Sequence, residues 1–97
     1  MEKIELDYPA KREVSNRAHV GVVGSGDMEV LLEPGEGTVA HVSVRTSVDG
    51  FGASWKAVLD RFFAKYDGVA RIQINDAGGT PGIAQLRLEQ AVEASEQ

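Results

Sequence analysis

The first half of the chain alternates apolar and polar residues, with a period of two that is typical of half-buried β-strands. The predicted strands, in chain order, cover residues 4–8, 18–22, 28–33 and 38–48. In the last of these, every second residue from Ala40 to Thr46 is expected to face the core. Residues 10–16 are polar and are predicted to form a loop, and Pro34–Gly37 is a strong turn signal.

After residue 48 the apolar period lengthens to that of a helix. Apolar residues recur at intervals of three and four positions at Trp55, Val58, Leu59, Phe62 and Tyr66. Ser54 is predicted to cap the start of this helix, and Asp67-Gly68 is predicted to end it. The aromatic members of the stripe are interpreted as core residues.

A short strand and a second helix complete the predicted elements. The strand covers residues 70–74, and Thr80-Pro81 then supplies an N-cap and a proline at the first helical position. The helix contains the apolar residues Ile83, Leu86, Leu88, Ala91 and Val92. Leu86 and Leu88 cannot share a narrow apolar stripe, so the helix has either a broad apolar face or a start that this spacing does not fix. The tail, residues 93–97, is expected to fray.

This order of elements, β-β-β-β-α-β-α, predicts an α+β fold built as a two-layer sandwich. We expect one domain over residues 1–97, with a mostly antiparallel sheet of about five strands and both helices on one face. The first four strands are expected to form an antiparallel meander.

Composition and charge exclude several classes of function. The chain has no cysteine, which rules out disulfides, thiolate metal sites and thiol nucleophiles. Its net charge of −5, with scattered basic residues, argues against nucleic acid and anionic membranes as partners. The charged N-terminal stretch resembles no signal peptide, and no apolar run reaches the length of a membrane span, so a cytoplasmic protein is expected.

Conventional active sites find little support in the sequence. A hydrolase nucleophile elbow needs glycine two positions on either side of the serine, whereas Ser25 has Gly24 and Gly26 directly beside it. His19 and His41 lie within predicted strands and are expected to be satisfied or to face solvent. The glycine-rich stretch 76–82 precedes a helix and could receive an anion, but a simple strand-to-helix connection is the favoured interpretation.

Ser25 itself has two interpretations that spacing alone does not separate. Gly24, Ser25, Gly26 and Asp27 could form an ordinary hairpin turn, with glycines supplying positive φ angles. The same small neighbours suit a hydroxyl that is presented to a modifying enzyme. Asp27 could orient Ser25 or, as favoured, hydrogen-bond to the backbone of the turn.

Several stretches of the chain resemble the acyl carrier (delta) subunit of malonate decarboxylase. The likeness rests on residues 21–34, 45–50, 77–82 and 86–90, together with Trp55, and it spans roughly residues 17–92. The acyl carrier (gamma) subunit of citrate lyase is a more distant relative. That family usually has glutamate before the serine, where this chain has Gly24, which favours the malonate enzyme.

The resemblance implies a non-catalytic carrier whose Ser25 holds a covalent prosthetic group, 2′-(5″-phosphoribosyl)-3′-dephospho-CoA. It also implies the partners of such a carrier: the transferase and decarboxylase subunits, a malonyl-loading transferase and the enzyme that attaches the prosthetic group. An acetyl or malonyl thioester would travel on the arm, and no metal site is expected. Two alternatives stay open, a citrate lyase-type carrier and a small scaffold or interaction domain.

Overall fold

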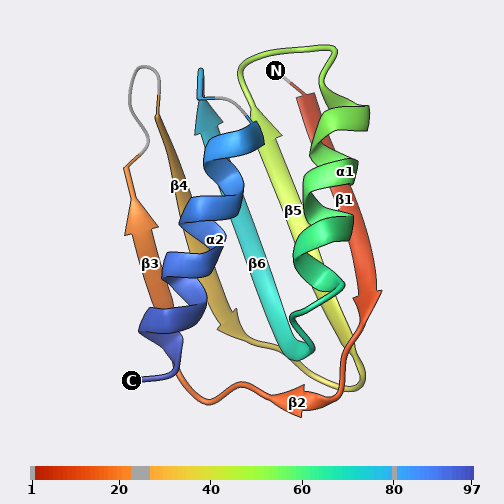
Figure 1. Ribbon diagram of the computed structural model, residues 1–97, viewed down its shortest axis with the longest axis vertical. Coiled ribbons are helices and arrows are strands. Elements are labelled where there is room, and N and C mark those ends of the chain that lie inside the picture. Colours follow the sequence, from red (N-terminus) through yellow and green to blue (C-terminus); the bar gives the residue numbers. More distant parts are fainter. Residues whose placement is uncertain (1, 23–26, 80) are drawn as a thin grey trace.

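The computed structural model describes residues 2–22, 27–79 and 81–97, which form a mixed sheet with two helices packed on one of its faces (Figure 1). The strands are β1 (Glu2–Pro9), β2 (Arg12–Glu13), β3 (Ala18–Gly21), β4 (Asp27–Pro34), β5 (Val39–Thr46) and β6 (Gly68–Ala77). The helices are α1 (Gly52–Phe63) and α2 (Pro81–Ser95). The predicted α+β class is confirmed, with both helices on the same side of the sheet.

The order of strands in the sheet is β1-β5-β6-β4-β3, so the predicted antiparallel meander is wrong. β6, the last strand in the sequence, lies between β4 and β5, antiparallel to β4 and parallel to β5. The turn after β4 passes the start of β6, where the Gly35 N–H donates to the Val69 carbonyl at 2.9 Å. A Cβ at position 35 would lie 3.1 Å from the Ala70 backbone, so a glycine allows this close passage.

The predicted loop at residues 10–16 contains an additional short strand. β2 pairs in parallel with the first residues of β6, and the N–H groups of Lys11 and Arg12 both donate to the Asp67 carbonyl. The order of elements is therefore β-β-β-β-β-α-β-α. Both residues of β2 are exposed, so no burial pattern in the sequence marks this strand.

The core lies between the sheet and the helices, as the periodicity predicts. The alternate residues of β5, from Ala40 to Thr46, are all buried against it. From α1, the predicted aromatic residues Trp55 and Phe62 are buried, together with Tyr66 just beyond the helix. The apolar spacing therefore identified the inner faces of β5 and α1 correctly.

Both ends of α1 differ from the prediction. The helix begins at Gly52 with Phe51 in the N-cap position and no side-chain cap, which leaves Ser54 inside the first turn. It ends at Phe63, before Asp67-Gly68, and the N–H of Ala64 bonds to the carbonyl of Asp60. The two cap signals in the sequence, Ser54 and Asp67-Gly68, therefore did not locate the ends of this helix.

In α2 the start is as predicted, whereas the apolar face and the tail are not. Pro81 is the first helical residue, and the predicted cap Thr80 lies outside the described residues. Leu86 is 53% exposed, so the helix has a narrow buried face and not a broad one. The predicted fraying of the tail is also wrong: α2 continues to Ser95, and the Asn16 amide donates to the carbonyls of Ser95 and Gln97.

Candidate functional site

Ser25 belongs to the connection between β3 and β4, two antiparallel strands in which Gly21 pairs with Glu29. Gly24, Ser25 and Gly26 lie outside the described residues, so the site is described from the two ends of the connection. β3 is the last strand at one edge of the sheet. The connection therefore starts from an edge strand and leads into the start of β4.

Gly21, at the end of β3, can only be a glycine. Its φ angle is +80°, in the left-handed region that side chains disfavour. A Cβ at this position would collide with the carbonyl oxygen of Met28 and would lie 3.3 Å from the Nε of Arg87. The strand end is therefore packed closely against β4 and against a side chain of α2.

Asp27, at the other end of the connection, is held by two hydrogen-bond donors. Its Oδ1 accepts the N–H of Met28 at 2.7 Å and the Nη2 group of Arg87 at 3.2 Å. The bond from the Met28 N–H, followed by that from Arg87, lowers the pKa of the Asp27 carboxyl. The carboxylate is thus a stable anion that bonds to the backbone next to it, and a weak base.

Arg87 is the residue of this region to which sequence reasoning gave no role. Besides Asp27, it contacts Gln90, which accepts a hydrogen bond from Nη1 at 3.1 Å. Arg87 follows Asp27 by 60 positions, so the ion pair leaves no local pattern in the sequence. Only the docking of α2 on β3 and β4 brings the two side chains together.

The glycine-rich stretch after β6 lies next to Asp27 and has the structure of a strand-to-helix connection. Gly78 forms an isolated bridge with Asp27, and the N–H of Gly79 donates to Oδ1 of Asp76 at 2.8 Å. The second oxygen of Asp76 accepts the hydroxyl of Thr46, also at 2.8 Å. The Gly79 N–H is therefore bonded within the protein and not available to an anion, as expected of a strand-to-helix connection.

The two histidines are not brought together. His19 on β3 contacts Glu29 at 2.9 Å, and His41 on β5 contacts Asp7 at 2.6 Å. β4 and β6 separate the strands that carry them. In the ranges that the structure describes, no group of three or more His, Cys, Asp or Glu residues could hold a metal ion.

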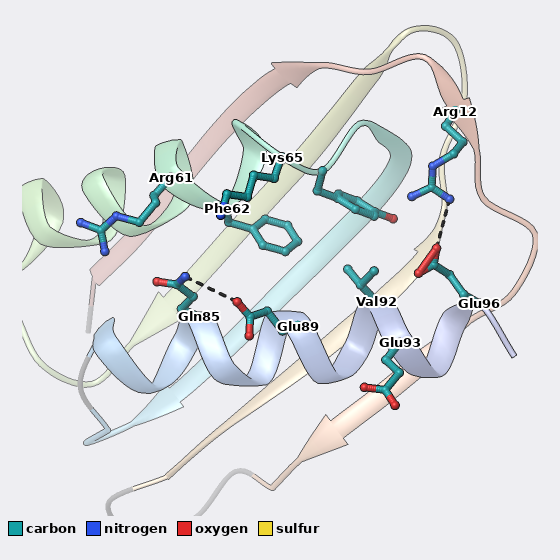
Figure 2. Close-up of a pocket in the computed structure, with 10 residues that line it drawn as sticks. Arg12, Arg61, Phe62, Lys65, Gln85, Glu89, Val92, Glu93 and Glu96 are labelled. Atoms are coloured by element: carbon teal, nitrogen blue, oxygen red, sulfur yellow. Dashed lines mark hydrogen bonds and ion pairs between the residues drawn. The ribbon is translucent and has the colours of Figure 1, made fainter.

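A groove of about 540 Å³ between α1 and α2 is a second candidate binding surface (Figure 2). Phe62, Val92 and Tyr66 supply its apolar part, and Arg12 lies 5.4 Å above the Tyr66 ring while pairing with Glu96. The Tyr66 hydroxyl is buried with no partner among the described residues, and burial raises its pKa. Among the residues that the structure describes, none that lines the groove belongs to β3 or β4, the strands on either side of the connection with Ser25.

In the part of the chain that the structure describes, no helix is both long and apolar enough to cross a membrane.

Comparisons with known proteins agree on one family. The family model described as malonate decarboxylase delta subunit (MdcD) matches residues 15–95. The malonate decarboxylase acyl carrier proteins of Azotobacter vinelandii and Klebsiella pneumoniae are 46% and 45% identical to this chain, each alignment covering 96% of the chain and 95% of the relative.

A solved structure gives the same result at the level of the fold. One chain of a crystal structure of a Pseudomonas malonate decarboxylase hetero-tetramer, in complex with malonate, superposes with a TM-score of 0.92 and 43% sequence identity. The match covers 98% of this chain and 99% of that one. The chain therefore belongs to the malonate decarboxylase delta subunit family, the acyl carrier subunits of that enzyme.

Proposed function

We propose that this chain carries an acetyl or malonyl thioester on a 2′-(5″-phosphoribosyl)-3′-dephospho-CoA arm attached to Ser25, within a malonate decarboxylase complex. The observation that supports this proposal is that Ser25 lies in the sequence between β3, an edge strand, and β4, in a chain of the delta subunit family. The other subunits of the complex, a transferase and a decarboxylase, act on the thioester in turn.

The position at the edge suits a carrier for a physical reason. An arm that visits several catalytic pockets must leave from a point that each partner can approach, and β3, which precedes the connection, is an edge strand of the sheet. Tethering also raises the concentration of the acyl group at those pockets far above its free value.

Attachment of the arm requires a nucleophilic substitution at phosphorus. The Ser25 hydroxyl attacks the innermost phosphorus of a triphosphoribosyl donor, a new P–O bond forms, and the bond to the leaving pyrophosphate breaks. The hydroxyl proton passes to a base of the attaching enzyme, because a free serine is a weak nucleophile. Asp27 is a poor candidate for that base, since its pKa is lowered and its Oδ1 already accepts two hydrogen bonds.

The proposal is tested by the intact mass of the purified chain after incubation with the attaching enzyme and its donor. We expect a mass increase of one prosthetic group in the wild type and in Ser15→Ala, a control at an exposed loop position. Ser25→Ala should remain folded, with a loss of about 0.5 kcal/mol or less, and should gain no arm. Ser25→Thr keeps a hydroxyl but adds a methyl group that stiffens the side chain, so slow loading is expected.

Two results would contradict the proposal. A folded Ser25→Ala chain that still gains the arm would place the attachment elsewhere. A wild-type chain that gains no mass under conditions that load another delta subunit would favour a scaffold or interaction domain, in which Ser25 is only part of a turn.

A further inference from the structure

The groove between α1 and α2 combines an apolar part with charged sides (Figure 2). Phe62 of α1, which is buried, and Val92 of α2, which is half-buried, contribute apolar side chains from the two helices. At one end of the groove Arg12 pairs with Glu96 at 3.5 Å. The groove therefore offers an apolar surface that opens between two helices on the side of the protein away from the sheet.

The two sides of the groove carry opposite charges. Arg61 and Lys65 line it from α1 and the residues just after that helix, and are called the basic wall. Glu89 and Glu93 line it from α2, and are called the acidic wall. All four side chains are exposed. The two glutamates are four positions apart on one helix, where like charges are neighbours and destabilise the helix.

The charges of the two walls are not neutralised within the part of the chain that the structure describes. No ion pair there joins the basic wall to the acidic wall, or either wall to a third residue. Glu89 accepts a hydrogen bond from the Gln85 amide at 3.5 Å, which leaves its charge in place. Charges of both signs therefore remain available to a molecule that lies between the walls.

An exposed leucine extends the apolar surface beyond the groove. Leu86 is 53% exposed and precedes Glu93 by seven positions, so the two residues lie about two turns apart on the same side of α2. A partner that lies along α2 would remove Leu86 and the apolar part of the groove from water, which favours association.

We propose that the groove holds a segment of another subunit of the malonate decarboxylase complex. This segment places apolar side chains on Phe62, Val92 and Leu86, carboxylates against the basic wall, and lysine or arginine side chains against the acidic wall. A similar chain is part of a crystallised hetero-tetramer, which favours a subunit of different sequence over a second copy. The inference rests on the proposed function for membership of the complex, and requires neither Ser25 nor the arm.

Affinity for the remaining subunits of the complex, measured by titration with the full-length chain, tests the chemistry of the partner. Arg61→Glu and Glu93→Lys should each weaken binding at least about 10-fold, because reversal places like charges against each other. Leu86→Gln should weaken it roughly 3- to 10-fold through the loss of apolar area. Arg45→Glu and Glu36→Lys, matched reversals at exposed positions outside the groove, should bind like the wild type. Melting curves establish that each variant is folded.

The absence of cysteine from the chain allows a direct test of which surface is covered. The variants Lys65→Cys, Leu86→Cys and Glu93→Cys report on the groove and its border. Arg45→Cys is the control, because it alternates with the buried residues of β5 and so lies on the sheet face away from the helices. Reaction with a maleimide is followed by the intact mass of the carrier chain. We expect every variant to react in the free chain, and only the control to react at the same rate within the complex.

Each other outcome overturns the inference. Equal reactivity of Lys65→Cys and Glu93→Cys in the free chain and in the complex would show that the groove stays open. Protection of Arg45→Cys instead would assign the interface to the open face of the sheet. Protection in the free chain that increases with its concentration, together with a dimer in sedimentation, would make a second copy the occupant. Protection without an effect of charge reversal would refute the chemistry stated for the partner.

The same measurements on Ser25→Ala separate this inference from the proposed function. This variant should gain no arm and should still assemble with its groove protected. If the wild type gains no arm but its groove is protected, the proposed arm on Ser25 fails and the inference stands. If the wild type is loaded and its groove stays open, only the inference fails. A wild-type chain that does not bind the other subunits would contradict both.

Discussion

Replacing Gly21 and Gly37 by alanine, each in its own variant, separates two energetic costs that usually occur together: backbone strain and steric collision. Gly21 has a φ angle of +80°, and an added Cβ would collide with the Met28 carbonyl oxygen. Gly37 has nearly the same φ angle, +77°, with no atom within 4 Å of an added Cβ. Gly37→Ala therefore reports the strain alone, and Gly21→Ala reports strain plus collision.

The expected magnitudes follow from these two environments. A left-handed alanine costs roughly 1–2 kcal/mol, and part of this is offset because alanine restricts the unfolded chain more than glycine does. Gly37→Ala should therefore lower the free energy of unfolding by about 1 kcal/mol. At Gly21 the backbone must also move away from Met28 and Arg87, and overpacking of this kind adds about 1–3 kcal/mol. A total of about 2–4 kcal/mol is expected for Gly21→Ala.

Urea and thermal denaturation, followed by circular dichroism, would measure both variants. For a chain of this size, each kcal/mol corresponds to a change in Tm of about 4–8 °C. We therefore expect a decrease of about 4–8 °C for Gly37→Ala and at least twice as much for Gly21→Ala. Equal decreases would refute the reasoning, because the collision with Met28 would then have no cost and β3 would not be packed as closely as described.

Two further predictions concern the site. Ordinary phosphopantetheinyl transferases with CoA should leave the chain unmodified. They recognise a serine at the start of a helix in four-helix carriers, whereas Ser25 lies in the sequence between two strands. A mass increase of one phosphopantetheine would contradict this prediction. Asp27 should contribute to the pH dependence of stability. Its pKa is lowered in the folded state, so its contribution is fully present above the unfolded value of about 4 and is lost as the pH falls through the folded value. As the pH falls from about 5 to about 3, the free energy of unfolding of Asp27→Asn should decrease less than that of Glu36→Gln, an exposed control. Equal decreases would count against the ion pair with Arg87.

The sequence by itself determined most elements and their inner faces. The sequence shows which side of an element is apolar, by alternation from Ala40 to Thr46 and by helical spacing from Trp55 to Phe62. Burial in the core requires that side to face inward. These are local properties, since each element displays its own period. The family was also accessible from the sequence, because residues 21–34 and the other stretches that carry the resemblance are each contiguous.

The tertiary structure decided what the periods do not encode, namely which elements are neighbours. Alternation places Val42 and Val30 on inner faces, but the insertion of β6 between β5 and β4 follows from pairing across the sheet. β2 forms through backbone hydrogen bonds of exposed residues, which leave no apolar signature. The contact of Arg87 with Asp27 also leaves no local pattern in the sequence, because the two residues are 60 positions apart. They become neighbours only when α2 packs on β3 and β4, which depends on how the helices and the sheet assemble.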